Sequence, residues 1–296
     1  ILNFSSEIEN LCALKYLNKI SGDAVEAMIR IQVDLAIYEI MMGRRANFRL
    51  RDVSSVFRDT DWFTYVKRIF QKGDEFVPDR IYKEKPILHF ATHNLLAFSK
   101  PVFNALGNRV SFIEVVRHPL YMIIQQTQNQ SNHYKRNATA RQFHLFIKYK
   151  DEQLPFWNYG QEKLYLNGNP VERAIYEMWH IKKITEYSKK NELQKNSDKI
   201  LTIPFEPFIF NPFPYLEKIV NLLKSNITSK TRKVMKKQKV PRKKISDGIP
   251  LAIYKRFGWE PPIDEFSEKQ EMDKRRNFAI SQGANKNALE MLDKMS

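Results

Sequence analysis

The chain has 296 residues and a formal net charge of +16, from 49 Lys and Arg against 33 Asp and Glu. Hydrophobic residues make up 43% of it, which is typical of a globular protein and excludes an intrinsically disordered chain. Cys12 is the single cysteine, so no intrachain disulfide can form, and no run of about 18 apolar residues is present to cross a membrane.

The first third of the sequence predicts helices. Ser6 and Glu9 have the spacing of a capping box at a helix start. Residues 25–41 carry apolar side chains at helical intervals, and residues 62–70 repeat this pattern. We therefore expect three helices before the first strand.

Two short apolar segments predict strands: ILHFAT at residues 87–92 and VSFIEVV at residues 110–116. Their β-branched and aromatic residues are typical of a sheet that is buried on both faces. The sequence between them can hold one helix, and KILTIPF at residues 199–205 predicts a third strand. This order indicates an α/β fold, with a central and mostly parallel sheet flanked by helices, in a single domain over residues 1–296.

The later part of the chain alternates helices and loops. Residues 171–190 and 215–224 predict amphipathic helices, because their apolar residues recur every three or four positions. Residues 151–170 are polar and aromatic and predict a loop, with a short hairpin around Asn167 and Gly168 as an alternative, and residues 262–296 predict a helical tail.

Polar side chains stand at the end of each predicted strand. Thr92 and His93 end the first, Arg117 and His118 follow the second, and Glu206 follows the third. Ligands of open α/β sheets bind beyond the carboxyl ends of the parallel strands. The sequence therefore predicts a binding site where these five side chains converge.

Three stretches, ATHNLLAFSKP, FIEVVRHPLYMIIQ and ILTIPFEPFIFNPFPYLEKIVNLL, occur in this order within residues 85–223. Together they resemble the sulfotransferase family, whose members use 3′-phosphoadenosine 5′-phosphosulfate. In the family, a Thr-His motif after a strand supplies the catalytic base, which implies His93 as base and Thr92 as a residue that binds the co-substrate. The arginine that ends the next strand holds the 3′-phosphate, which implies Arg117.

The resemblance implies three further residues that bind the co-substrate. Gln125 stands where the family has a serine on the 3′-phosphate, and its amide can also donate a hydrogen bond. Residues 230–244 hold nine Lys and Arg and no acid and predict a basic loop, and VPRKK within them is similar to the family's C-terminal basic loop. This likeness implies Arg242 and Lys243.

The sequence also departs from the family pattern. Ala91 stands where the cytosolic members have a lysine, and Phe205 and Pro207 replace a Tyr and an Asp of the third motif. The family's Gly-, Ser- and Thr-rich loop for the 5′-phosphosulfate does not occur in the first 80 residues. The chain begins at Ile1, and ILNFSSEI resembles the segment directly after that loop in the family, so we expect the loop upstream.

The resemblance implies transfer of a sulfuryl group to a hydroxyl or amine acceptor, a glycan or a small molecule, with His93 as general base. A histidine pKa of about 6.5 suits removal of a proton at neutral pH, and an arginine fork suits a phosphate. No metal is required, and scattered histidines with one cysteine give no zinc-ligand spacing.

Other functions stay open from the sequence. One is a non-catalytic protein of the same fold, or a basic module that binds nucleic acid through residues 230–244; another is a P-loop kinase of small nucleotides. Aromatic residues do not alternate with the basic run, which makes nucleic acid the less favoured partner, and no GxxxxGK motif supports a kinase. A homo-oligomer is compatible with the sequence. We expect a cytoplasmic protein, unless a membrane anchor precedes the catalytic region.

Overall fold

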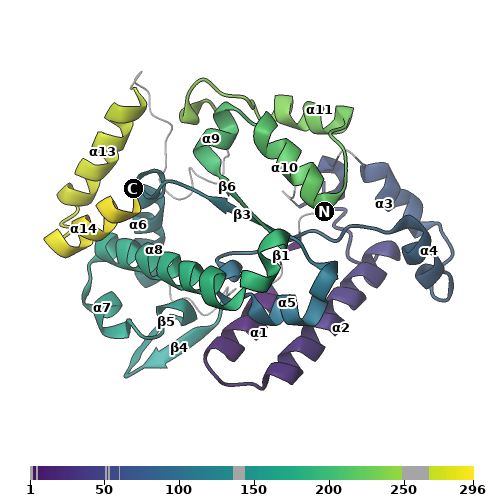
Figure 1. Cartoon of the computed structure of the whole chain (residues 1–296), viewed down its shortest axis with the longest axis horizontal. Helices are drawn as coiled ribbons and strands as arrows, with labels where there is room; N and C mark the ends of the chain where they lie inside the picture. Colours follow the sequence, from purple (N-terminus) through teal and green to yellow (C-terminus); the bar gives the residue numbers. More distant parts are fainter. Residues whose placement is uncertain are drawn as a thin grey trace. The chain divides into compact units, whose positions relative to one another are not determined.

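The structure is a computed structural model, and it describes residues 3–4, 6–50, 52, 54–59, 61–135, 144–248 and 267–296. Two compact units divide the chain, Ile1–Gly107 and Asn108–Ser296. Most of the described residues are helical, and short strands make the whole a broad α/β mix (Figure 1). The single domain over residues 1–296 and the central sheet flanked by helices stay predictions.

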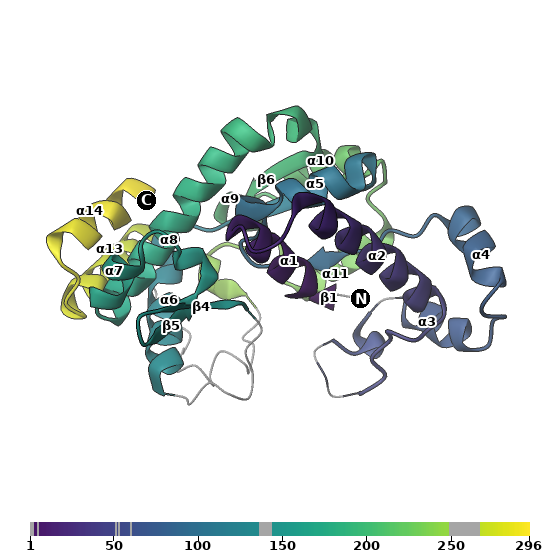
Figure 2. The same cartoon turned by 90° about the horizontal axis from the view of Figure 1, so that it is seen from below.

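Helices make up most of the first unit: α1 (Ser6–Tyr16), α2 (Gly22–Met41), α3 (Trp62–Ile69), α4 (Phe76–Glu84) and α5 (Lys100–Leu106). The α1, α2 and α5 helices pack side by side (Figure 2). Val25 and Ile29 of α2 are fully buried, and the Ser21 side chain caps this helix by accepting the Ala24 N–H. The helices predicted over residues 25–41 and 62–70 are therefore confirmed.

The first predicted strand is shorter in the structure than in the prediction. Only β2 (Phe90–Ala91) is a strand, and it pairs in parallel with β1 (Asn3–Phe4). Pro86 has no N–H for a strand ladder, and Ile87 is 71% exposed, so the start of the predicted segment contributes little to a buried sheet.

The second unit contains the other two predicted strands. β3 (Phe112–Val116) and β6 (Ile200–Pro204) pair in parallel, with Phe112 opposite Ile200 and Val116 opposite Pro204. The sequence predicts that β3 is buried on both faces. This prediction is wrong, because Val115 is 58% exposed. The parallel pairing of these two strands is confirmed.

Four helices form the hydrophobic core of the second unit: α6 (Pro119–Lys135), α8 (Pro170–Tyr187), α13 (Glu268–Ser281) and α14 (Lys286–Met295). The α6 helix packs against α8 and α13, and α14 packs against α8 (Figures 1 and 2). Their shared core consists of apolar side chains, among them Ile123, Ile175, Ala279, Ala288 and Leu292. The α13 and α14 helices lie within the predicted helical tail.

The remaining elements of the second unit are β4 (Phe146–Tyr149), β5 (Glu152–Pro155), α7 (Glu162–Asn167), α9 (Phe205–Phe210), α10 (Phe213–Leu223) and α11 (Ser229–Lys237). β4 and β5 form an antiparallel hairpin. The loop predicted over residues 151–170 is therefore wrong, because Leu154 of β5 and Tyr165 of α7 are buried within ordered elements. Phe156 and Trp157 between them are also buried, and the buried side chains have no regular spacing that the sequence could show. Asn167 and Gly168 end α7 and form no hairpin.

Short segments connect these elements. They are 3-10 turns at Val56–Arg58, Leu95–Phe98, Gly107–Arg109, Phe156–Asn158, Gln194–Lys199 and Ile245–Asp247, and a π-helical turn at Ser188–Glu192. Over the described part of the chain, no helix is both long and apolar enough to cross a membrane.

Candidate functional site

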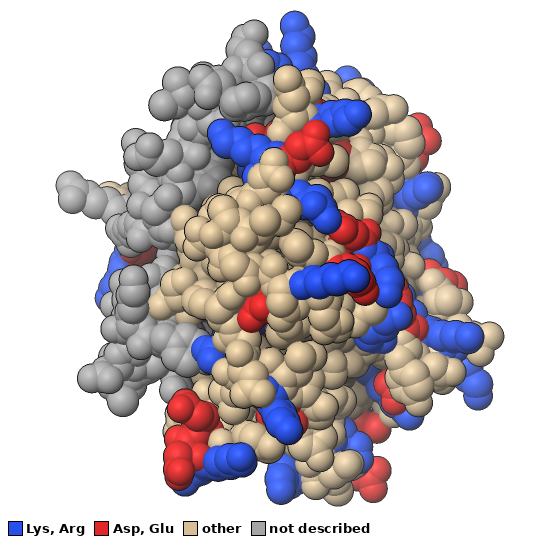
Figure 3. Space-filling model, turned by 90° about the vertical axis from the view of Figure 1, so that its left-hand side faces the viewer, with Lys and Arg blue, Asp and Glu red and all other residues tan. Residues whose placement is uncertain are grey.

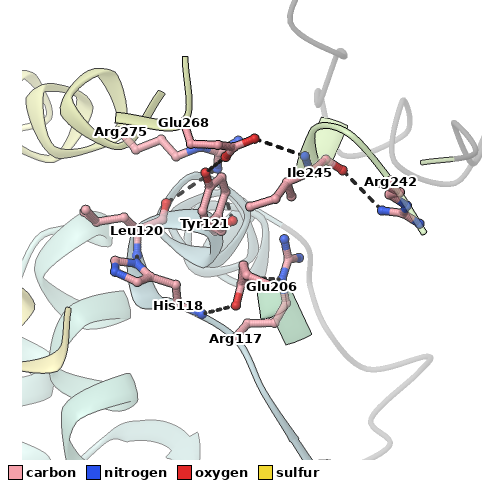
Figure 4. Close-up of polar contacts among 9 residues, drawn as sticks. All are labelled: Arg117, His118, Leu120, Tyr121, Glu206, Arg242, Ile245, Glu268 and Arg275. Atoms are coloured by element: carbon pink, nitrogen blue, oxygen red, sulfur yellow. Dashed lines mark hydrogen bonds and ion pairs between the residues drawn. The ribbon is translucent and has the colours of Figure 1, made fainter. Parts of the chain in front are cut away.

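Three of the predicted site residues meet beyond the carboxyl ends of β3 and β6 (Figure 4). Val116 lies opposite Pro204 in the parallel ladder, so the residues that follow each strand are neighbours. Arg117 and His118 come directly after β3, and Glu206 lies in the first turn of α9 after β6. The predicted convergence is therefore confirmed for three of the five side chains, and that of Thr92 and His93 stays a prediction.

Glu206 orients the segment that follows β3. Its Oε2 accepts the backbone N–H of His118 at 3.1 Å, and its Oε1 lies 3.5 Å from Nε of Arg117. The guanidinium carbon of Arg117 also lies 4.8 Å from the centre of the Phe205 ring, a cation–π distance. The carboxylate engages Nε, and the guanidinium fork has two further nitrogens that can bind an anion.

Arg242 lies in the loop that follows α11 and is bonded to α9, the helix that carries Glu206. Its backbone N–H donates to the carbonyl of Ile209 on α9 at 2.8 Å, and α9 directly follows β6. Its Nη1 donates to the carbonyl of Ile245 at 3.2 Å, and its Nη2 donates to the carbonyl of Gln238 at 3.3 Å. The buried Nε has no hydrogen-bond partner among the described residues. A Cβ at Gly248 would lie 2.8 Å from Nη1, so any larger residue there would displace the guanidinium group.

The two arginines repel each other. Burial lowers the pKa of Arg242, the nearby charge of Arg117 lowers it further, and Asp247 raises it. An anion between the two guanidinium groups would relieve this repulsion, and arginine forks make strong charge-assisted hydrogen bonds to phosphate. Arg117 and Arg242 therefore form a candidate anion-binding site.

His118 has a structural role beside this site. Its Nδ1 accepts the backbone N–H of Leu120 at 3.3 Å, at the start of α6. This contact requires an unprotonated Nδ1. Burial lowers the pKa of His118, and this effect exceeds the opposite effect of the Glu206 charge. His118 is thus a neutral helix cap.

Gln125 and Lys243 lie on elements that adjoin the site. Gln125 is half-buried on α6, the helix that begins just after Arg117. Lys243 is exposed and follows Arg242 in the basic loop. Their contact with a co-substrate stays a prediction.

Thr92 and His93 belong to the first unit, where they follow β2. The backbone N–H of His93 donates to Oε1 of Glu9 on α1, and Nδ1 of the ring lies 3.8 Å from the same oxygen. The His93 side chain is 57% exposed, Thr92 is half-buried, and Glu9 is buried. The sequence pattern assigns Glu9 to a capping box and gives no signal for its contact with His93. The role of His93 as a base stays a prediction.

A second polar cluster beside Arg242 was not predicted from the sequence. Tyr121 donates its hydroxyl hydrogen to Oε2 of Glu268, and Oε1 of Glu268 accepts the backbone N–H of Ile245 at 3.1 Å. Arg275 is buried, and its Nη1 donates to the carbonyl of Tyr121 at 3.1 Å. Tyr121 and Glu268 are 147 residues apart, so no local pattern could have paired them.

Basic side chains gather on α11. One side of this helix is half-buried through Thr231 and Met235, and its five basic side chains are exposed: Lys230, Arg232, Lys233, Lys236 and Lys237. A different distribution covers the face over α13 and α14, where Figure 3 shows basic and acidic side chains interspersed. The basic loop predicted over residues 230–244 is therefore wrong for its first half, which is the helix α11 with one basic face; the loop that carries Arg242 follows this helix.

Within the described ranges, no group of three or more His, Cys, Asp or Glu side chains is arranged to hold a metal ion. Comparison of the chain with models of protein families, with curated proteins and with solved structures gives no match. The likeness to sulfotransferases therefore depends on the three sequence motifs.

Proposed function

We propose that the protein is a sulfotransferase that binds the 3′-phosphate of 3′-phosphoadenosine 5′-phosphosulfate with Arg117 and Arg242. The observation that carries this proposal is the placement of two arginines after parallel strands: Arg117 directly follows β3, and the backbone of Arg242 is bonded to α9, which directly follows β6. Open α/β folds bind their ligands at this edge. In the proposal, the two strands belong to a central parallel sheet flanked by helices.

The two arginines of the site support a phosphate ligand. Arg117 pairs with Glu206 through Nε, and the charge of Asp247 acts on Arg242, so the guanidinium forks are what the site offers to an anion. Glu206 and Phe205 orient Arg117, and carbonyl groups orient Arg242, so both forks are held before a ligand arrives. In the proposal, Thr92, Gln125 and Lys243 add further contacts to the co-substrate, and no metal takes part.

The proposal assigns the proton step to His93. The co-substrate supplies the sulfuryl group when bound. As the acceptor oxygen or nitrogen bonds to sulfur, the bond from sulfur to the phosphate oxygen breaks, and His93 takes the acceptor's proton. The exposed ring can meet an acceptor, and the nearby Glu9 carboxylate can stabilise the imidazolium that forms. The acceptor class in this proposal is a glycan or a small molecule.

The first test is calorimetric titration with adenosine 3′,5′-bisphosphate, the desulfated product. We expect Arg117→Ala to weaken binding by roughly ten- to a hundredfold, which is about 1.5–3 kcal/mol for a charge-assisted phosphate contact. Arg276→Ala is the matched control, because Arg276 also pairs with one carboxylate, that of Asp293, and the substitution removes the same charge. Equal losses in the two variants, or no binding by the unmodified chain, would contradict the proposal.

The second test measures transfer of labelled sulfate from the co-substrate to a panel of hydroxyl and amine acceptors. We expect His93→Ala to lower the transfer rate by about 10²- to 10⁴-fold, the usual contribution of a general base, and to leave binding of adenosine 3′,5′-bisphosphate unchanged. His89→Ala, which removes a histidine four residues earlier, serves as the control. A transfer rate that survives His93→Ala would exclude this residue as the base.

A second candidate function is binding of nucleic acid, and the exposed basic face of α11 favours it. Lysine contacts to phosphates release counterions, so affinity for duplex DNA would fall steeply with salt concentration. Reversing the charge of Lys233 and Lys237 would reduce both the affinity and this salt dependence. Fluorescence anisotropy with labelled duplex DNA distinguishes this function from the first, because Arg117→Ala should leave it unchanged.

A further inference from the structure

Glu268, the first residue of α13, joins two segments that are distant in sequence. Its Oε1 accepts the backbone N–H of Ile245 at 3.1 Å, and its Oε2 accepts the hydroxyl hydrogen of Tyr121 (Figure 4). A carboxylate in the first turn of a helix is favoured by the helix dipole, and Ser267 caps α13 directly before it. The Glu268 side chain is therefore well placed to accept both bonds.

The peptide groups of Ile245 connect Glu268 to Arg242. The N–H of Ile245 is held by Glu268, and the carbonyl of Ile245 accepts a hydrogen bond from Nη1 of Arg242 at 3.2 Å. The backbone of Arg242 is held separately by Ile209. The direction of the guanidinium group thus depends on where the Ile245 carbonyl lies, and Glu268 determines this. Arginine has five N–H donors, so these contacts leave donors for an anion.

The hydrogen bond from the Tyr121 hydroxyl connects Glu268 to α6. Arg275 lies 5.0 Å from the centre of the Tyr121 ring and donates to the Tyr121 carbonyl, while Glu271 accepts from Nε of Arg275 at 2.7 Å. Burial and the hydrogen bond to Glu268 raise the pKa of Tyr121, so its hydroxyl remains a donor. The α6 helix begins two residues after Arg117. One network therefore contacts both α6, which begins just after Arg117, and the loop that carries Arg242.

We propose that Glu268 is a positioning residue for the anion-binding site: through Ile245 it orients the guanidinium group of Arg242. This inference rests on the proposed function, since the ligand is the 3′-phosphate of the co-substrate. Glu268 acts through Arg242 and does not touch the ligand. The α13 helix accordingly takes part in co-substrate binding from outside the site.

The test is a double-mutant cycle on the affinity for adenosine 3′,5′-bisphosphate. Arg242→Ala and Glu268→Ala are each expected to weaken binding by roughly tenfold, and the double variant should bind no more weakly than Arg242→Ala alone. Glu268→Gln keeps an oxygen that can accept the Ile245 N–H, so it should retain affinity within about threefold of the unmodified chain. Asp293→Ala, which removes the same charge from the neighbouring α14 helix, should leave affinity unchanged.

The outcomes separate the inference from the proposed function. Unchanged affinity in Arg242→Ala would overturn the anion-binding site itself. A loss in Arg242→Ala with none in Glu268→Ala, or additive losses in the double variant, would overturn the role of Glu268 alone. Glu268→Asp withdraws the carboxylate by one methylene group and keeps its charge, so it provides the test if Glu268→Ala does not fold. Weaker binding in Glu268→Asp than in Glu268→Gln is expected, and the reverse order would overturn the inference.

Discussion

At the scale of single residues, the imidazole of His118 links protonation to folding. Its Nδ1 must be unprotonated to accept the Leu120 N–H at the start of α6. Burial lowers the pKa of this ring in the folded protein below its ordinary value of 6.5. The folded state therefore favours the neutral ring. This contribution to stability is fully present above about pH 6.5 and is lost as the pH falls through the lower pKa of the folded state.

We expect the free energy of unfolding to fall between pH 7 and pH 5, and to fall less in His118→Asn. Asparagine can cap a helix through its side-chain oxygen but does not titrate in this range. Urea denaturation at pH 5, 6 and 7, followed by circular dichroism, measures the difference. The same pH dependence in both proteins would show that His118 is not the group responsible.

At the scale of elements, the side chain of Asn169 connects two parts of the second unit. Its Oδ1 accepts hydrogen bonds from the N–H groups of Val171 and Glu172 at 3.1 Å. The Glu172 carboxylate in turn accepts the Asn169 N–H, and this completes a capping box for α8. Its Nδ2 also donates to the carbonyl of Gly283 at 3.0 Å, in the turn between α13 and α14. Gly283 has a φ of +82°, which favours glycine in this turn.

We expect Asn169→Ala to lower the free energy of unfolding by about 1–2 kcal/mol, because it removes both the cap and the bond to the turn. Asn169→Ser keeps a capping oxygen and loses only the amide N–H bonds to Gln282 and Gly283, so its free energy of unfolding should fall by less. Urea denaturation of the two variants gives the comparison. If Asn169→Ser lowered the free energy of unfolding as much as Asn169→Ala, the helix cap would not be the source of the stability.

At the scale of the whole molecule, the single cysteine reports on the first unit alone. Cys12 is buried in α1, and burial, followed by the charge of Glu9, raises its pKa to about 12. The thiolate is the reactive form, so the native protein should react with a thiol reagent at pH 8 at least roughly a hundredfold more slowly than free cysteine.

Labelling of Cys12 across a urea series measures the opening of the first unit, and circular dichroism measures loss of helix in both units. Labelling should accelerate as the first unit unfolds, because unfolding exposes the thiol and returns its pKa to the ordinary range. Native labelling within tenfold of the rate of free cysteine would contradict the burial of Cys12.

The sequence by itself determined the elements whose patterns are local. The helical spacing of apolar residues predicted α2, α3 and α8, and short β-branched runs predicted β3 and β6. The polar residues after those two strands were predicted to meet, because parallel pairing places both carboxyl ends at one edge. The roles of His93 and Arg117 in sulfuryl transfer stay predictions from the three motifs.

Only the tertiary structure decided which distant groups complete the site. The Arg242 N–H donates a hydrogen bond to the Ile209 carbonyl, and Glu268 accepts hydrogen bonds from Tyr121 and Ile245. These bonds join segments that share no periodic pattern. Such contacts arise because buried polar groups must find hydrogen-bond partners wherever packing places them, and packing is a property of the whole unit. The sequence thus determined the strands and their end residues, whereas the folded second unit decided which groups hold Arg242.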